Sequence, residues 1–422
     1  MHSRDEIDIM SPVGSYESLT AAIHAGANSV YFGIEQLNMR AHSSNNFSFD
    51  DLKNIVEICN QAKIKTYLTV NTIIYDNEIE KMHKVVDAAA ENRVSAIIAS
   101  DMAVINYAKK KNVEVHASTQ LNVSNIESVE FFSKFCDVIV TARELSLTQV
   151  AEITGQIKEK QIKGPKGNLV KIEIFCHGAL CMAVSGKCYL SLHQYNSSAN
   201  RGACFQTCRR GYRVTDIETD DELNIENEYI MSPKDLSTIA FIDKIIEAGV
   251  SVFKIEGRAR SAEYVKTVTR CYDEAIKSYF AGTYSQEKIE NWQTQLSTVF
   301  NRGFWNGYYL GQRLGEWSEV YGSKATKIKV FIGKIVNYFS NIGVAEIKFE
   351  TDEILSVNDE IFIIGPTTGV VEQTIIEIRE DLKSVNNVTQ SSLFSIKTEE
   401  IVRRGDKLYK LLTNGKTKSE KS

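Results

Sequence analysis

A (β/α)₈ barrel followed by a small C-terminal β-barrel domain is the fold that this sequence predicts. Through the first 280 residues a short apolar strand, a turn and an amphipathic helix follow one another repeatedly. Strands that alternate with helices in this way form parallel sheets, and eight of them can close into a barrel. The expected strands are Asp8–Val13, Ser29–Ile34, Lys65–Thr72, Ser95–Asp101, Glu114–Thr119, Val138–Glu144, Lys171–His177 and Val250–Glu256.

The segments between these strands carry apolar residues at helical spacing. Leu52, Ile55, Val56 and Cys59 are three and four positions apart, which places them on one helix face suited to packing on a sheet. An open doubly wound sheet is the alternative architecture. The count of eight strands favours the barrel, and so does the first strand, which is followed by Met-Ser-Pro-Val-Gly instead of Gly-x-Gly-x-x-Gly.

Four regions follow from this pattern. We expect the barrel at residues 1–280, a helical and aromatic linker at 281–327, a β-domain at 328–412 and a disordered tail at 413–422. A cysteine-rich insertion at 178–228 follows the seventh strand and is far longer than an ordinary connection in a barrel. Loops of such length in compact domains commonly carry function.

Composition indicates a soluble globular protein of the cytoplasm. Hydrophobic residues make up 43% of the chain, charged residues 24%, and the formal net charge is -5. The first residues are charged, and no apolar run approaches the roughly 20 residues that cross a bilayer, so we expect neither a signal peptide nor a membrane partner. In a reducing compartment the 8 cysteines are metal ligands, nucleophiles or buried thiols, not disulfides.

Four cysteines of the insertion form the strongest chemical signal. Cys181, Cys188, Cys204 and Cys208 can converge as four thiolates on a zinc ion or an iron–sulfur cluster. The wide first gap favours the cluster over zinc, and unligated thiols remain a third possibility. Cys59, Cys136 and Cys271 lie within apolar patterns and are interpreted as core thiols.

The sequence has no motif that identifies a protease or a nucleotide-binding loop. It lacks His-Glu-x-x-His, Gly-x-Ser-x-Gly and Gly-x-x-x-x-Gly-Lys. Cys176 and His177 are adjacent on a strand, so their side chains point to opposite faces and are not expected to form a nucleophilic pair.

Polar residues gather at the ends of the expected strands, which form the active face of a barrel. Candidate substrate-binding residues there are Arg40, Asn71, Gln120, Arg143 and Lys254. His177, Glu256 and Arg258 are candidate catalytic residues, because a glutamate can act as a base and an arginine can hold a carboxylate in a bidentate hydrogen bond. An ion pair that fills a layer of the barrel is the alternative for Lys254 and Glu256.

The chain resembles the collagenase-like peptidase family, the unassigned peptidase family thirty-two. The specific motif is His-Gly-Ala-Leu-Cys-Met-Ala-Val-Ser-Gly-Lys-Cys at 177–188. Shorter motifs occur in the same order: Met-Ser-Pro-Val-Gly (10–14), Val-Tyr-Phe-Gly (30–33), Asn-Met-Arg-Ala (38–41), Asn-Phe-Ser (46–48), Met-Ser-Pro-Lys-Asp-Leu (231–236) and Lys-Ile-Glu-Gly-Arg (254–258). The resemblance covers nearly the whole chain, including the C-terminal β-domain.

The resemblance implies an iron–sulfur enzyme that hydroxylates without molecular oxygen. In the branch that acts on tRNA, it implies a 4Fe–4S cluster on Cys181, Cys188, Cys204 and Cys208, prephenate as co-substrate, and hydroxylation of the wobble uridine in the anticodon loop to 5-hydroxyuridine. The segment 191–202 departs from the pattern of that branch.

Two other functions stay open. One is a peptidase, which the family name implies, and the other is a non-catalytic RNA-binding protein stabilised by a metal. Candidate RNA contacts are Arg201, Arg209, Arg210 and Arg213 around the cysteines and Lys324, Lys327, Lys329 and Lys334 near the β-domain, with solvated basic surface as the alternative.

Overall fold

The computed structural model confirms the predicted barrel and shows how its strands are ordered. It describes residues 3–35, 37–41, 46–213, 215, 217–219, 231–312, 314–389 and 393–415. The eight parallel strands are β1 (Asp8–Pro12), β2 (Ser29–Phe32), β3 (Lys65–Val70), β4 (Ala96–Ala99), β5 (Glu114–Ala117), β6 (Val138–Val140), β7 (Lys171–Gly178) and β9 (Val252–Ile255). Each pairs with the next, and β9 pairs with both β7 and β1, so the sheet closes.

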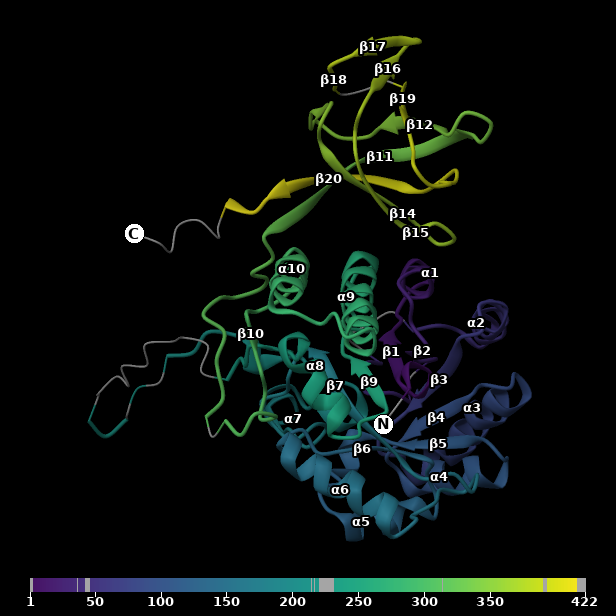
Figure 1. Cartoon of the computed structure of the whole chain (residues 1–422), viewed down its shortest axis with the longest axis vertical. Helices are drawn as coiled ribbons and strands as arrows, with labels where there is room; N and C mark the ends of the chain where they lie inside the picture. Colours follow the sequence, from purple (N-terminus) through teal and green to yellow (C-terminus); the bar gives the residue numbers. More distant parts are fainter. Residues whose placement is uncertain are drawn as a thin grey trace.

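Helices cover the outside of the barrel (Figure 1). They are α1 (Tyr16–His24), α2 (Phe49–Gln61), α3 (Ile79–Glu91), α4 (Met102–Lys110), α5 (Ile126–Ser133), α6 (Leu147–Glu159), α8 (Ile242–Glu247), α9 (Ala262–Phe280) and α10 (Gln286–Ser297). Several begin where a serine caps the first turn, as Ser15, Ser48 and Ser146 do with their hydroxyl oxygens. These caps and the apolar faces explain why the predicted helices form.

Strand side chains alternate between the two sides of the barrel wall. Ile9 packs outward in the large core under the helices, whereas Met10 joins Tyr31, Tyr67 and Val252 inside the barrel. Side chains two residues farther toward the carboxyl end of each strand lie on the same inner side, and they therefore point into the mouth of the barrel. This alternation decides which side chains can form a site.

Two short strands were not predicted. β8 (Asp235–Ser237) pairs antiparallel with the end of β7, and β10 (Phe304–Trp305) adds to β8, so both lie beside the barrel mouth. The cysteine-rich segment after β7 contains α7 (Leu190–Tyr195) and two short 3₁₀ helices, Ala199–Arg201 and Thr207–Arg209. Residues 214, 216 and 220–228 of the predicted insertion (178–228) lie outside the described residues.

The C-terminal region is an antiparallel β-domain, as the alternation predicts. Its strands are β11 (Lys327–Phe339), β12 (Val344–Phe349), β13 (Leu355–Ser356), β14 (Glu360–Gly365), β15 (Gly369–Thr374), β16 (Ile378–Glu380), β17 (Lys383–Val385), β18 (Asn387–Val388), β19 (Leu393–Lys397) and β20 (Lys407–Thr413). The main sheet has the order β15-β14-β20-β11-β12-β19-β16-β17. Residues 416–422 of the expected tail lie outside the described residues.

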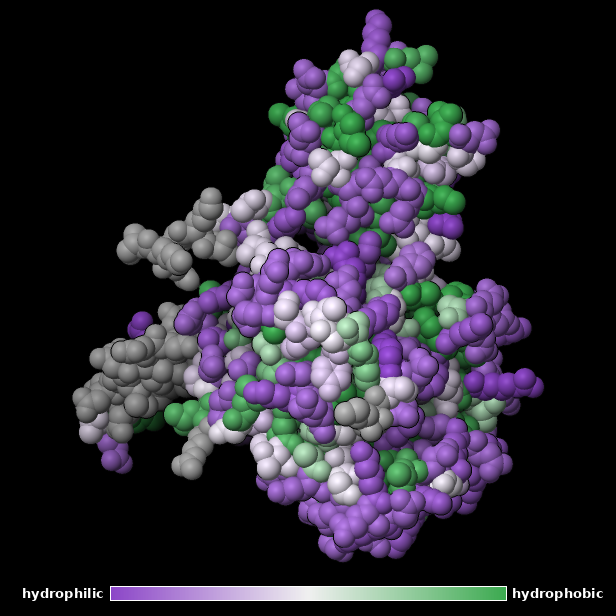
Figure 2. All heavy atoms as spheres, in the orientation of Figure 1, coloured by the Kyte–Doolittle hydropathy of each residue, from purple (hydrophilic) through white to green (hydrophobic). Residues whose placement is uncertain are grey.

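The β-domain packs on α1 and α9 (Figure 1). Ala21 and Ala262 of these helices share an apolar cluster with Phe362, Val370 and Leu411. Hydrophilic side chains cover most of the face of the barrel shown in Figure 2. Among the described residues, no helix combines the length and the apolar composition that crossing a membrane requires.

Candidate active site

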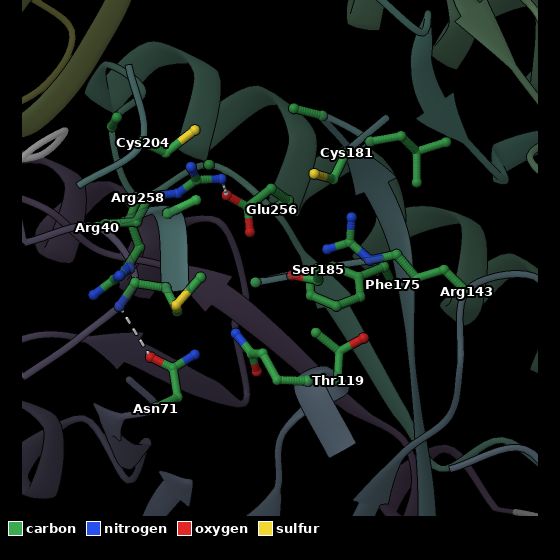
Figure 3. Close-up of a pocket in the computed structure, with 18 of the residues that line it drawn as sticks. Arg40, Asn71, Thr119, Arg143, Phe175, Cys181, Ser185, Cys204, Glu256 and Arg258 are labelled. Atoms are coloured by element: carbon green, nitrogen blue, oxygen red, sulfur yellow. Dashed lines mark hydrogen bonds and ion pairs between the residues drawn. The ribbon is translucent and has the colours of Figure 1, made fainter. Parts of the chain in front are cut away.

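A pocket of about 190 Å³ lies at the carboxyl ends of the barrel strands, under the cysteine-rich segment. Inward-facing strand residues form its floor, among them Tyr31, Thr69, Phe175 and Lys254, as their alternation requires. The four cysteines of the insertion form its upper wall. Figure 3 shows Cys204 and Cys181 approaching from two sides, with Glu256 between them. The pocket therefore occupies the position where barrel enzymes carry out their chemistry.

The lining of this pocket is strongly cationic. Seven lysine and arginine side chains line it, and Glu256 is the one acidic residue among its lining residues. The seven are Arg40, Arg143, Arg209, Lys254, Arg258, Arg260 and Arg302. Such an excess of positive charge in a partly enclosed cavity favours an anionic ligand.

Glu256 is an ionised anchor at the centre of this charge. Its Oε1 accepts a hydrogen bond from Nη2 of Arg40 at 2.7 Å. Burial alone would raise the pKa of Glu256, but Arg40, Arg143 and Arg258 outweigh it and lower the pKa to about 2. The same pair raises the pKa of Arg40. A carboxylate so firmly ionised is better suited to positioning cations than to transferring protons.

Arg258 is buried and fixed from two sides. Its Nη1 donates to Thr69 Oγ1 and its Nη2 to Asn38 Oδ1, both at 2.9 Å. Burial lowers the pKa of Arg258 to about 10, which leaves it charged at neutral pH. A Cβ on Gly33 would lie 2.5 Å from Arg258 Nη1, so the glycine admits the guanidinium. The separate motifs at 30–33, 38–41 and 254–258 thus meet around one side chain.

Like Arg260, which stacks on Phe300, Arg143 is a cation of the pocket that is available to a ligand. Its guanidinium stacks on the ring of Phe175, 3.9 Å from the centroid, and its buried Nε has no hydrogen-bond partner. Arg143 makes no ion pair within the described ranges. A planar, unpaired guanidinium that faces a cavity is suited to hold a carboxylate.

The remaining predicted substrate-binding residues also line the pocket. Asn71 Oδ1 accepts the backbone N–H of Met39 at 3.2 Å, and Gln120 bonds to Ser118. Lys254 Nζ donates to Glu173 Oε1 at 2.7 Å and lies over the Tyr31 and Phe175 rings. For Lys254 the structure therefore shows an ion pair within the barrel, with its amine at the pocket floor.

The four cysteines share the pocket as free thiols. Cys181 is exposed, and Cys188, Cys204 and Cys208 are partly buried. Burial raises the pKa of Cys208 to about 11, and the other three thiols add to the shift by repulsion. In the part of the chain that the structure describes, no three His, Cys, Asp or Glu side chains form a group that could hold a single metal ion. As a donor set, four thiols in one cationic pocket fit an anionic iron–sulfur cluster.

His177 lies outside the pocket, behind the barrel wall. A β-bulge between Phe175 and His177 shifts the register with β9 and turns the ring toward α9. There its Nδ1 lies 3.3 Å from Tyr272 Oη, and burial lowers its pKa to about 3. The ring is a neutral packing element, since it is buried among aromatic side chains.

At least three of the four predicted RNA-contacting arginines bond to other groups of the protein itself. Arg201 makes a two-pronged ion pair with Glu78 and stacks on Tyr75. Arg209 donates to Ser232 Oγ and to the carbonyls of Leu180 and Pro233, which ties the cysteine segment to the chain before β8. Arg210 bonds to Tyr195 Oη, and Arg213 is exposed.

The four lysines near the β-domain that were predicted to contact RNA are each paired with a glutamate. The pairs are Lys324–Glu319, Lys327–Glu360, Lys329–Glu263 and Lys334–Glu350. Lys329 links β11 to α9, which is a structural role.

Several lining residues were not singled out from the sequence. Tyr31, Ser118 and Phe175 share the inward parity of their strands, and this signal could have found them. Thr119 and Arg302 have no comparable signal, because Thr119 begins a short 3₁₀ helix (Thr119–Leu121) after β5 and Arg302 lies in the chain before β10.

The protein is thus a (β/α)₈-barrel protein whose barrel mouth combines a cationic pocket with four thiols. Residues 14–319 match the description of peptidase family U32, and the chain belongs to this family. It is 61% identical over 406 residues to a protein named Collagenase from Porphyromonas gingivalis, covering 96% of this chain and 98% of that one. It is 30% identical over 382 residues to tRNA hydroxylation protein P1 of Bacillus subtilis, covering 89% and 87%. It is also 31% identical over 324 residues to the 23S rRNA 5-hydroxycytidine C2501 synthase of Escherichia coli, covering 74% and 47%.

Proposed function

We propose that this chain is an iron–sulfur-dependent RNA-modifying enzyme that hydroxylates the tRNA wobble uridine to 5-hydroxyuridine with prephenate as co-substrate. The observation that carries the proposal is a pocket lined by seven cations, one carboxylate and four thiols at the catalytic end of the barrel. Relatives named for tRNA and rRNA hydroxylation support RNA as the substrate.

Each part of the pocket has a role in this proposal. Cys181, Cys188, Cys204 and Cys208 would hold a 4Fe–4S cluster, which supplies redox chemistry when bound. Arg143 would clamp a carboxylate of prephenate, because its guanidinium is stacked on Phe175 and has no ion pair within the described ranges. The wall of the pocket against which prephenate would lie takes its shape and charge from Arg40, Glu256 and Arg258.

Replacing Arg143 by alanine should weaken the binding of prephenate. Loss of one charged bidentate contact costs on the order of 1.5–3 kcal/mol, which is about 10- to 100-fold in dissociation constant. Isothermal titration calorimetry of purified protein measures this directly. Arg379→Ala, on an exposed arginine of the β-domain that pairs with Glu377, is the matched control and should bind as the wild type does. An unchanged constant in Arg143→Ala would locate the acid elsewhere.

Deleting the gene should remove 5-hydroxyuridine and nucleosides made from it from cellular tRNA. Mass spectrometry of digested tRNA measures the loss, and the wild-type gene should restore the modification. A gene carrying Cys204→Ala should not restore it, because the proposed cluster would lack one ligand. Unchanged tRNA nucleosides in the deletion strain would contradict the proposal.

The second candidate is a peptidase, which is favoured by 61% identity to the Collagenase of P. gingivalis. Within the described ranges no Ser, Thr or Cys side chain is hydrogen-bonded to a histidine ring. Incubating anaerobic, iron-loaded protein with gelatin tests this candidate. Cleavage by this protein, together with wild-type tRNA nucleosides in the deletion strain, would establish the peptidase. Stoichiometric zinc without iron and without either activity would instead indicate a metal-stabilised binding protein.

A further inference from the structure

A second cavity of about 230 Å³ lies beside the pocket just described. The segment 180–185, which carries Cys181, lines both cavities and forms a wall between them. Thr119 and Arg143 also line both. The opposite side of the second cavity comes from the chain around β10, through Trp305, Tyr308, Gly315 and Trp317. None of the roles proposed above uses this side.

Three aromatic rings surround a glycine in this cavity. The rings of Trp305 and Tyr308 meet edge to face at 5.2 Å between centroids. A Cβ placed on Gly315 would lie 3.5 Å from Tyr308 Oη and 3.8 Å from a ring carbon of both Trp305 and Trp317. Because residue 315 has no side chain, the rings border open space that they could share with a flat ligand.

Two residues that line this cavity carry a buried N–H without a hydrogen-bond partner. Trp305 is only 5% exposed, and its buried indole N–H has no hydrogen-bond partner. The Nε of Arg143 is likewise buried without a partner. A buried donor without an acceptor is costly, so a ligand that offers acceptors at these points gains affinity. Asn122 and Glu144 also line the cavity and supply acceptors of their own.

We propose that this second cavity binds an unpaired pyrimidine base of the RNA substrate, an inference that rests on the function proposed above. A pyrimidine is flat, stacks on aromatic rings, and carries carbonyl acceptors that match the N–H groups of Trp305 and Arg143. The wall that it shares with the first pocket carries Cys181, so the base lies next to the cysteines without entering the cationic pocket. An aromatic side chain of a peptide is the alternative occupant, and it lacks the two acceptors.

The test uses an RNA stem–loop with a uridine at the wobble position and the same stem–loop with an abasic nucleotide there. Two of the three tryptophans of the chain line the cavity, so binding of the uridine stem–loop should quench intrinsic fluorescence. We expect Trp317→Ala to weaken binding of the uridine stem–loop by about 10- to 100-fold, the range for loss of one base-stacking partner. The abasic stem–loop should bind the variant and the wild type equally.

Gly315→Leu provides a second variant that retains every aromatic ring and fills the space between them. It should lose the preference for the uridine stem–loop over the abasic one. The control is Trp292→Phe, because Trp292 lies in α10, where its indole donates to Glu274. This control should keep both the preference and the quenching. Circular dichroism and iron content check that each variant is folded and loaded.

Three outcomes separate this inference from the proposed function. Equal binding of the two stem–loops by wild-type protein that still hydroxylates tRNA would overturn the inference alone. Selective, Trp317-dependent binding without any change of tRNA nucleosides in the deletion strain would overturn the hydroxylation and retain the base site. Quenching by a gelatin peptide that competes with the stem–loop would assign the cavity to a peptide and overturn the inference.

Discussion

Replacing any one of Cys181, Cys188, Cys204 or Cys208 with alanine is expected to abolish iron–sulfur loading of this protein. All four thiols line one pocket, and each would bind a different iron of a 4Fe–4S cluster, so one lost thiolate leaves one iron without its protein ligand. Wild-type protein purified without oxygen should be brown and contain iron and sulfide. Each variant should be bleached, as iron and sulfide assays and the visible absorption spectrum will show.

Cys59→Ala is the matched control for these variants. Cys59 is a fully buried thiol in α2, far along the chain from the insertion, and burial raises its pKa to about 12. This variant should keep the colour and the iron content of the wild type. Stoichiometric zinc in anaerobic wild-type protein, without iron or sulfide, would contradict the cluster and with it the proposed chemistry.

Most of the barrel could be predicted because its signal is local. Each expected strand is a short apolar run followed by an amphipathic helix, and all eight occur close to their expected bounds. Strands β8 and β10 could not be predicted, since they have three and two residues and form only beside the end of β7. Their pairing depends on contacts between distant parts of the chain, which periodicity does not record.

The site was predictable where one segment carries its chemistry and unpredictable where several segments meet. The four cysteines of the insertion and the polar residues expected at the strand ends, Glu256 among them, line two walls of the pocket. The bulge that turns His177 outward has no sequence signature, and neither has the pairing of Arg201 with Glu78, 123 residues away. The second cavity joins Cys181 to Trp317, so the sequence alone did not indicate it.

Replacing Glu173 with glutamine should destabilise the barrel strongly. Glu173 is fully buried, with one oxygen 2.7 Å from Lys254 Nζ and the other 3.4 Å from His116 Nδ1. Glutamine keeps the shape and removes the charge, which leaves the buried Lys254 uncompensated. Breaking a buried ion pair in this way costs about 3–5 kcal/mol, and in a barrel of this size we expect the melting temperature to fall by roughly 10 °C. Differential scanning calorimetry measures the shift.

The double variant Glu173→Met with Lys254→Met is the control, because it removes both charges and replaces them with apolar volume. Its melting temperature should recover most of the loss, since exchanging a whole buried pair for hydrophobic residues is often neutral. Equal destabilisation by the single and double variants would mean that packing, not charge, is what the glutamine disturbs.

The pH dependence of unfolding provides an independent check on this network. Burial alone would lower the pKa of His116, but Glu114 and Glu173 outweigh burial and raise this pKa above 6.5. The charged His116 therefore stabilises the folded protein fully below pH 6.5, and this stabilisation is lost as the pH rises through the pKa of His116 in the folded state. Burial alone would raise the pKa of Glu114, but His116 and Lys166 outweigh burial and lower this pKa to about 2. The ionised Glu114 therefore stabilises the folded protein above pH 4.5, and this stabilisation is lost as the pH falls toward 2. In Glu173→Gln, His116 keeps one carboxylate, and the alkaline loss of stability should move to lower pH. An alkaline limb that does not move would show that Glu173 is not what keeps His116 protonated.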